Sequence, residues 1–184
     1  LKTIDAVLDL YNGDIREADK KLTSLVSSSP SDEVFRSLAL SRLMLGDNES
    51  AKEMAAKAVS QNKNNISNLI IQAYVAQSQF DLNKAQSVIE QAIKLDPQNT
   101  TALLILAQLQ FGSDYQDEAL DTLRTARTSG EQSALVENLA GFVLMSKRSY
   151  DEANTAFNRS LNIDPSLAEP HMGLGLIAMR QGNP

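Results

Sequence analysis

Three groups of residues in the sequence have types or spacings that are found in sites of chemistry. His171 is the only histidine and is therefore the only candidate for an imidazole base or metal ligand. The stretch Gly173-Leu174-Gly175-Leu176-Ile177-Ala178 fits the G-x-G-x-x-A pattern of dinucleotide-binding loops. Asp114, Asp117 and Glu118 place three carboxylates close together, as in a calcium site.

Each of these patterns is better explained by a structural role than by a catalytic or ligand-binding one. A dinucleotide loop follows a strand, whereas Gly173 lies inside a predicted helix. His171 falls in a column of large packing residues described below, and the acidic residues surround a helix start, where carboxylates stabilise the helix dipole. With one His, no Cys and no oriented pair of carboxylates, we expect a chain without enzymatic activity, cofactor or metal.

Composition narrows the classes of partner. The 184 residues are 42% hydrophobic and 22% charged, which is enough apolar material for a sizeable core. The formal net charge is −6 and no segment is basic, so nucleic acid and anionic membrane surfaces are not expected as partners. No stretch approaches the roughly 18 continuous apolar residues of a membrane span, so we expect no direct membrane insertion by this chain.

The elements that would position any site are set by a repeat. Small residues recur every 34 residues in three columns that stay in phase, apart from a spacing of 33 between Ala18 and Ala51. The first is Ala51, Ala85, Ala119 and Ala153, preceded by Ala18; the second is Ala39, Ala73, Ala107, Gly141 and Gly175; the third is Ala58, Ala92, Ala126 and Ser160. Small residues at a fixed phase let two helices cross closely, and a larger residue there is expected to overpack the crossing.

The pattern between the columns is helical. The stretch LLILAQLQF (103–111) is apolar on most sides, and DEALDTLRTA (117–126) is amphipathic. Gly13, Gly46 and Gly182 stand where a first helix should end, and the Asp-Pro pairs at 96–97 and 164–165 close the second helix. We therefore predict an all-α solenoid of stacked antiparallel helix pairs, forming a single domain over 1–184. The repeats are placed at about 1–31, 32–65, 66–99, 100–133 and 134–167, with a lone C-terminal helix and tail over 168–184.

These features resemble the tetratricopeptide repeat, whose pattern is W-x2-L-G-x2-Y, then A-x3-F, then P within a repeat of about 34 residues. HMGLGLIA supplies His171, Leu174, Gly175 and Ala178; ANTAF supplies Ala153 and Phe157; and Asp164-Pro165 supplies the close. The large residue of the first helix departs from the pattern, being Phe35, Leu69, Leu103, Glu137 and His171 in turn. The resemblance implies a right-handed superhelix in which the first helices line a concave groove that binds peptides or other proteins.

Mapping the groove-lining face of such arrays onto this sequence gives a set of candidate binding residues. They are Arg36, Leu40 and Leu43; Ile70, Tyr74 and Gln77; Leu104, Gln108 and Phe111; Asn138, Phe142 and Met145; and Met172, Leu176 and Met179. The set is mostly apolar, so the hypothesis is a groove for an apolar or amphipathic segment. Only Arg36 and Asn138 resemble the residues that bind a terminal carboxylate in chaperone-binding members, and they lie three repeats apart. Packing of Leu104, Phe111 and Phe142 between helices stays an open alternative.

The predicted function is a protein-interaction scaffold. Two alternatives remain: an accessory array of a bacterial envelope lipoprotein that serves polysaccharide secretion, or one attached to a catalytic protein such as a glycosyltransferase. The degenerate repeats and the Asn-, Gln- and Ser-rich loops are typical of a bacterial protein. The location is left open between the cytoplasm and the bacterial periplasm or envelope, with a slight preference for the envelope. Because the chain begins with Leu1 and stops just after a helix, we expect it to be a piece of a longer protein. An uncovered flank formed by Leu174, Ile177 and Ala178 predicts weak self-association through the C-terminal helix.

Overall fold

The computed structural model describes residues 2–130 and 132–182, and these residues form eleven α-helices and no strand. Leu1, Glu131, Asn183 and Pro184 lie outside the described residues. The chain divides into two compact units, the N-terminal unit (1–97) and the C-terminal unit (98–184). The all-α prediction of five helix pairs and one further helix is confirmed, whereas a single continuous array over 1–184 stays a prediction.

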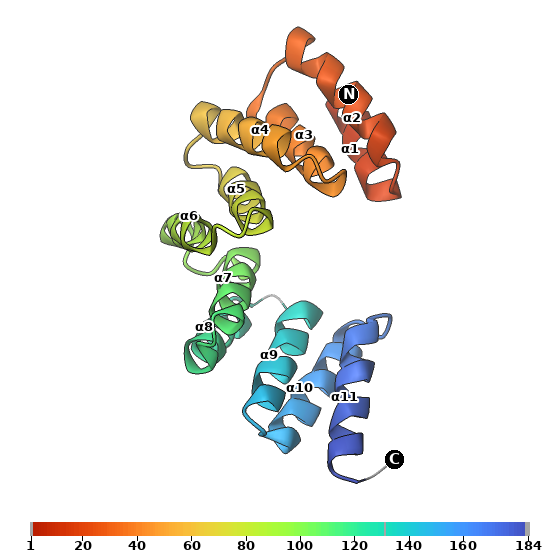
Figure 1. Ribbon diagram of the computed structural model, residues 1–184, viewed down its shortest axis with the longest axis vertical. Coiled ribbons are helices and arrows are strands. Elements are labelled where there is room, and N and C mark those ends of the chain that lie inside the picture. The colour runs from red at the N-terminus through yellow and green to blue at the C-terminus, as the bar shows by residue number, and fades with distance from the viewer. Residues whose placement is uncertain (1, 131, 183–184) are drawn as a thin grey trace. The chain divides into compact units, whose positions relative to one another are not determined.

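The N-terminal unit contains three antiparallel helix pairs, shown from red to yellow-green in Figure 1. Within each pair the two helices pack together, and neighbouring pairs contact through α2 with α3 and α4 with α5. The first helices are also adjacent, since α3 contacts both α1 and α5. The helices are α1 (Lys2–Asn12), α2 (Ile15–Ser28), α3 (Asp32–Met44), α4 (Asn48–Gln61), α5 (Ile66–Ser78) and α6 (Leu82–Leu95).

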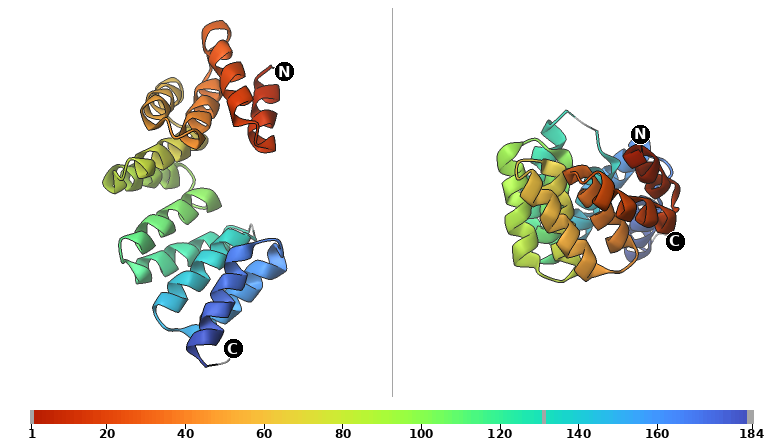
Figure 2. Two further views of the ribbon diagram at one scale, coloured as in Figure 1. Left: turned by 45° about the vertical axis from the view of Figure 1, so that its right-hand side comes forward. Right: turned by 90° about the horizontal axis from the view of Figure 1, so that it is seen from above.

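The C-terminal unit contains two helix pairs and the lone helix. Its helices are α7 (Thr100–Gly112), α8 (Gln116–Thr128), α9 (Ala134–Ser146), α10 (Tyr150–Ile163) and α11 (Ala168–Arg180). Helices α9, α10 and α11 lie side by side in both Figure 1 and Figure 2, and all three contact one another. Helix α9 also contacts α7, so the first helices α7, α9 and α11 are neighbours in this unit.

The small-residue columns lie at the helix crossings. Every alanine of the three columns is fully buried, and Ser160 is buried with them. The Ser160 hydroxyl donates a hydrogen bond of 2.8 Å to the carbonyl oxygen of Ala134, so this polar replacement for alanine is satisfied inside the core. The predicted role of the columns is therefore confirmed, except at Gly175, which is exposed on α11.

The turn that follows the first helix of each repeat contains one residue in the left-handed region. Gly13, Gly46 and Gly182 have positive φ angles there, as the sequence predicted. The intervening pairs place Phe80, Asp114 and Arg148 in the same conformation, with φ of 60°, 69° and 62°. These three residues carry a Cβ that the conformation disfavours, so the turn, which recurs once in every repeat, imposes the conformation on whatever residue stands there.

Side-chain caps fix several helix starts. Ser31, Asn99 and Ser133 accept hydrogen bonds from backbone N–H groups in the first turns of α3, α7 and α9. Asp47 and Asp81 do the same at α4 and α6. Such caps satisfy N–H groups that have no partner within the helix, which sharpens the boundaries between the repeated helices.

A polar network joins two helix pairs of the N-terminal unit. The buried Asn68 side chain on α5 donates to the Asp32 carboxylate of α3 at 3.0 Å and to the carbonyl oxygen of Ala58 at 3.1 Å. Its own carbonyl oxygen accepts from Arg36 at 3.2 Å, and Asn65 donates to the same Asp32 oxygen at 3.0 Å. These hydrogen bonds hold the pKa of Asp32 below its ordinary value, with Asn68 the main cause.

The core of the C-terminal unit is built around Phe157 of α10. Its ring is fully buried and packs with Ala153 and Ile177. Two glycines lie against it: a Cβ added to Gly141 of α9 would lie 2.5 Å from the ring, and one added to Gly173 of α11 would lie 2.4 Å away. The two glycines therefore make room for the largest buried side chain of this core.

None of the described helices is long and apolar enough to cross a membrane.

Candidate interaction surfaces

The G-x-G-x-x-A stretch has a packing role. It lies within α11, and Gly173 is the glycine that contacts the ring of Phe157. Gly175 faces open space, with no atom within 4 Å of an added Cβ. The helical interpretation of this stretch is confirmed.

His171 does not pack as the sequence predicted. The buried residues of α11 are Pro170, Gly173 and Ile177, which follow one helical face, and His171 lies off that face and is exposed. Pro170 and Ile177 stand one repeat after the buried Val136 and Val143 and are buried in the same way. Among the described helices only α9 and α10 pack on α11, and they leave the side that carries His171 exposed.

The acidic residues at the start of α8 are engaged in local polar contacts. The Asp114 carboxylate accepts a hydrogen bond of 2.6 Å from the Gln116 amide, and Asp117 forms an ion pair with Lys147 at the end of α9. Among residues 2–130 and 132–182, no group of three acidic, His or Cys side chains is arranged to hold a metal ion. Asp114 and Asp117 thus support the helix start and the contact with the next pair.

In the N-terminal unit the predicted groove residues are half-buried on α3 and α5. They are Arg36, Leu40, Leu43, Ile70, Tyr74 and Gln77. Leu40 and Tyr74 pack against the cluster formed around Ala39, Ala55 and Val75, and burial raises the pKa of Tyr74. Arg36 is held by Asn68. These half-buried residues pack against the core, and their role in binding stays a prediction.

In the C-terminal unit the first of the predicted rows lies on α7. Leu104 is only 8% exposed and belongs to the core, Phe111 is half-buried, and Gln108 is exposed. The packing alternative therefore applies to Leu104.

The second row lies on α9, where Asn138, Phe142 and Met145 are half-buried. The Phe142 ring meets the Phe157 ring edge-on, with centroids 5.0 Å apart, so Phe142 supports the core from its surface side. The Asn138 Oδ1 atom is buried and accepts no hydrogen bond within the described chain. This row is therefore a part-buried surface with one unsatisfied acceptor.

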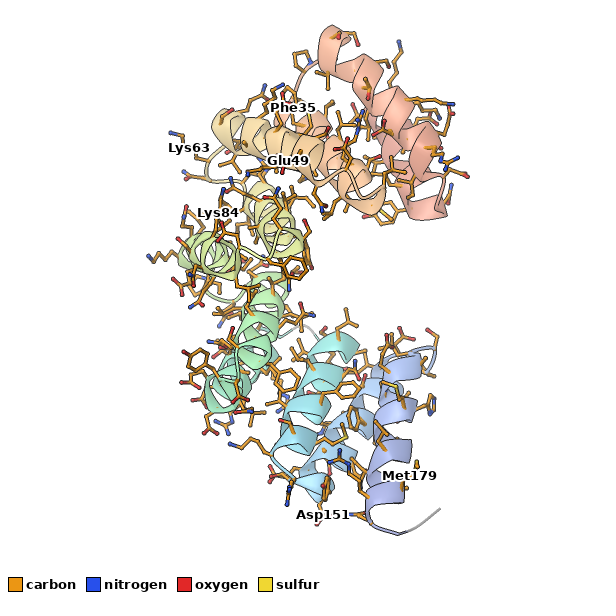
Figure 3. The ribbon with its side chains drawn as sticks, in the orientation of Figure 1. Phe35, Glu49, Lys63, Lys84, Asp151 and Met179 are labelled. Carbon is orange, nitrogen blue, oxygen red and sulfur yellow. The ribbon has the colours of Figure 1, made fainter. Side chains whose placement is uncertain are left out.

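The third row, on α11, is the most accessible. Met172, Leu176 and Met179 are 55%, 40% and 74% exposed, and their spacing places them on one helical face. Met179 stands near the C-terminal end of α11 in Figure 3. Each of the three lies one repeat interval after a member of the α9 row, and α9 contacts α11. The two rows thus form one surface, which we name the α9–α11 face: Asn138, Phe142, Met145, Met172, Leu176 and Met179.

The uncovered flank predicted on α11 is wrong at Ile177, whereas Leu174 and Ala178 are half-buried, as a partly uncovered flank requires. Ile177 is buried against Ala153 and Phe157, and Leu174 is half-buried at the edge of the same cluster. The reason is that Gly173 lets α11 approach Phe157 closely, which covers the Ile177 side. The exposed apolar side chains of α11 are instead those of the α9–α11 face.

The α9–α11 face carries no charged side chain, although 22% of the chain is charged. Three of the five methionines of the sequence lie on it. Depletion of charge with enrichment of Met and aromatic residues is typical of the centre of protein interfaces.

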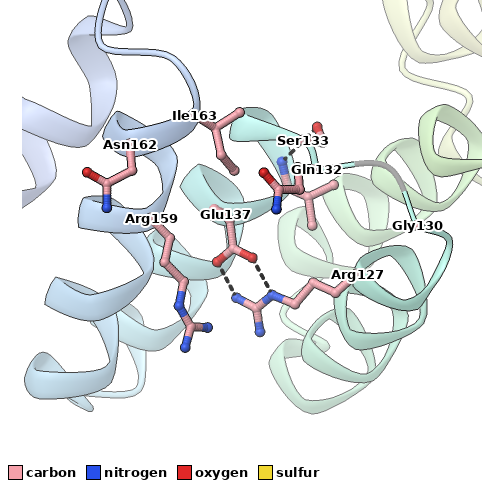
Figure 4. A pocket seen from close by; sticks show the side chains of 9 residues that line it. Arg127, Gly130, Gln132, Ser133, Glu137, Arg159, Asn162 and Ile163 are labelled. Carbon is pink, nitrogen blue, oxygen red and sulfur yellow. Dashed lines mark hydrogen bonds and ion pairs between the residues drawn. The ribbon is translucent and has the colours of Figure 1, made fainter.

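Sequence reasoning missed a cavity of about 530 Å³ at the junction of α8, α9 and α10. Arg127, Glu137 and Arg159 line it, and Figure 4 shows Arg127 and Glu137 in contact, with Arg159 on the α10 side of Glu137. The sequence contained one sign of this cavity. Glu137 is charged, whereas the residues at the same position of the preceding repeats, Phe35, Leu69 and Leu103, are apolar.

The family comparison agrees with this architecture. A family model described as a tetratricopeptide repeat-like domain matches residues 45–174. A comparison with curated proteins finds no match.

Solved structures with the same arrangement of helices cover nearly the whole chain. A thermophilic tetratricopeptide repeat protein of Thermus thermophilus has a TM-score of 0.86 at 16% identity and covers 97% of each chain. PilF of Pseudomonas aeruginosa has a TM-score of 0.83 at 15% identity, covering 99% of this chain and 83% of that one. A chain of the Cut9–Hcn1 hetero-tetramer of the APC/C has a TM-score of 0.88 at 16% identity, covering 98% of this chain and 36% of that one. At these identities the likeness shows the fold.

Proposed function

The chain belongs to the tetratricopeptide repeat-like family, and from this premise we propose that it is a protein-interaction scaffold that binds an apolar or amphipathic segment of a partner on the α9–α11 face. The fold supports protein interaction in general. The specific proposal is that Met172, Leu176 and Met179 contact the partner directly, while Phe142 and Met145 form the floor beneath it.

The observation that carries the proposal is the exposure of three large apolar side chains in line on α11, beside a second apolar row on α9. Exposed apolar residues scattered singly over a surface need no explanation, but a continuous uncharged row marks an interaction surface. The methionines favour a partner that presents Leu- or Phe-like side chains, because the flexible thioether adapts its shape to such groups.

The energetics suit a reversible complex. Burying one Leu-sized side chain of a partner contributes roughly 1.5–3 kcal/mol. Two or three such anchors contribute roughly 3–9 kcal/mol, and the upper end of this range matches the about 8 kcal/mol of a micromolar complex. The remaining contacts of the segment must then offset the entropy lost on association. An isolated segment should therefore bind measurably and exchange quickly.

A displayed library of random peptides tests the proposal with the whole chain as bait. We expect enriched peptides to carry several large apolar residues and to bind with micromolar affinity. Leu176→Glu should weaken these peptides by about tenfold or more, because a carboxylate would then face their apolar side chains.

Leu95→Glu is the matched control. Leu95 is 45% exposed, close to the 40% of Leu176, but lies on α6 in the N-terminal unit. It should leave peptide affinity unchanged. Peptides that bind Leu176→Glu as tightly as the wild-type chain would place the binding surface elsewhere.

The same exposed row supports the further proposal that the chain self-associates weakly through α11. The surface proposed for this contact is formed by Met172, Leu176 and Met179, and it replaces the predicted flank around Ile177. A self-association of this kind would compete with partner binding, because both bury the same side chains.

A further inference from the structure

The cavity at the junction of α8, α9 and α10 lies within the C-terminal unit and is separate from the residues of the α9–α11 face. Its volume is about 530 Å³. Arg127 comes from the last turn of α8, Glu137 and Val136 from the first turn of α9, and Arg159 and Ile163 from α10. Three helices therefore contribute to one polar site with apolar walls.

The repeat shows that Glu137 is an unusual residue for its position. The residues at the equivalent position of the preceding repeats are Phe35, Leu69 and Leu103, and all three are buried apolar side chains. Glu137 is buried to a similar degree, with its side chain only 10% exposed. A charge at this depth is destabilising unless it is paired, and an apolar pair of similar size is often at least as stable. Stability alone therefore gives no reason for a carboxylate here.

The carboxylate holds Arg127 in a fixed orientation. Arg127 Nε donates to Glu137 Oε1 and Arg127 Nη2 to Glu137 Oε2, both at 2.7 Å. This side-on, two-point contact sets the plane of the guanidinium group and leaves the N–H groups of Nη1 unused. Arg127 is thus a pre-oriented donor on the wall of the cavity.

Arg159 supplies a second cation. Figure 4 shows its guanidinium group on the α10 side of Glu137, beside the contact between Glu137 and Arg127. No ion pair or hydrogen bond to the Arg159 side chain occurs within residues 2–130 and 132–182. The Arg127–Glu137 pair accounts for two of the three charged groups among the described lining residues, and the third, Arg159, is exposed and has no partner there.

The charges of the three side chains select the class of ligand. Among the described residues that line the cavity, two guanidinium groups and one carboxylate sum to +1, in a chain whose formal net charge is −6. A single negative charge would neutralise the site, whereas a doubly charged phosphate would be repelled by Glu137. A carboxylate is planar and matches the two-point geometry of guanidinium donors.

The apolar walls favour a ligand whose carboxylate is attached to an apolar chain. Val136 and Ile163 line the same cavity as the arginines. We propose that this cavity binds an organic monocarboxylate with a short apolar chain: the carboxylate lies between Arg127 and Arg159, and the chain lies against Val136 and Ile163.

Hexanoate is the probe for the test, added to the whole ¹⁵N-labelled chain and followed by amide chemical shifts. We expect saturable shifts at Ser133, Val136 and Asn162, which line the cavity. Arg159→Gln removes the unpaired cation without touching the buried pair, so the fold should be retained. It should weaken hexanoate binding by about tenfold or more.

Arg124→Gln is the matched control, since Arg124 lies on α8 one turn before Arg127 and is exposed. It should leave hexanoate binding unchanged. Hexan-1-ol and inorganic phosphate complete the set and should produce no saturable shifts at these amides. The proposal is overturned if hexanoate gives no saturable shifts, if hexan-1-ol or phosphate binds as well as hexanoate, or if Arg159→Gln binds hexanoate like the wild type.

Discussion

The ring of Phe157 occupies the space that a Cβ atom on Gly173 would need. That atom would lie 2.4 Å from Cζ of the ring, and Gly141 also lies against the ring, since a Cβ there would be 2.5 Å from it. The pair explains why a helix former such as alanine is absent at both glycine positions.

Gly173→Ala should therefore destabilise the chain by roughly 1–3 kcal/mol through overpacking, although Gly→Ala usually stabilises a helix. Gly175→Ala, two residues along the same helix and facing open space, should stabilise it by about 1 kcal/mol. Urea unfolding of the two variants measures the opposite signs. In the double variant, Phe157→Leu should reduce the loss of stability caused by Gly173→Ala. If Gly173→Ala alone stabilised the chain, the Phe157 ring would have to move aside without cost.

A second prediction concerns the left-handed turn residue Phe80. Its φ of 60° disfavours any side chain, and the ring is 90% exposed, so it gains little from packing. Phe80→Gly should raise stability by about 1 kcal/mol, because glycine adopts this conformation without steric cost. Phe80→Ala removes the ring but keeps the Cβ and should change stability less. Equal melting temperatures for the two variants would mean that the strain is absent.

Acid sensitivity should depend on Asp32. Its pKa in the folded chain lies below the ordinary value of 3.8, so the folded state binds fewer protons there than the unfolded state. The stability that Asp32 contributes is present above that value and is lost as the pH falls through the folded pKa. Asp32→Asn should lower stability at neutral pH and flatten its decline in acid. Urea unfolding at a series of pH values measures this, and an unchanged acid slope would contradict it.

Self-association through α11 should appear as a sedimentation coefficient that rises with concentration. Leu176→Glu should abolish the rise, because it places a charge at the centre of the exposed row, and Leu95→Glu should preserve it. A strictly monomeric wild-type chain at high concentration would exclude this contact.

The parts of the fold that repeat could be predicted from the sequence. Ala51, Ala85, Ala119 and Ala153 share one environment, so their spacing revealed the helix crossings directly. The same logic could have located the turn residues Phe80, Asp114 and Arg148, because each stands a whole number of repeat intervals after Gly46. These three residues were not recognised as left-handed because the residue in such a turn is usually glycine.

The parts that depart from the repeat could not be predicted in this way. Phase alone places Ile177 on a free flank, whereas its burial depends on how closely Gly173 lets α11 approach Phe157. The cavity depends on where Arg127 and Arg159 extend, which spacing does not reveal. Glu137 interrupted an apolar column, and such an interruption is the local sign that a repeat has a role beyond stacking.

The main helix–helix contacts join helices that are at most two apart along the chain. Folding therefore requires the closure of short segments only, and a chain with such local contacts is expected to fold rapidly, from any pair that forms first. Hydrogen exchange should then resolve several protection levels, with α9 and α10 around Phe157 opening more slowly than α1 at the chain end.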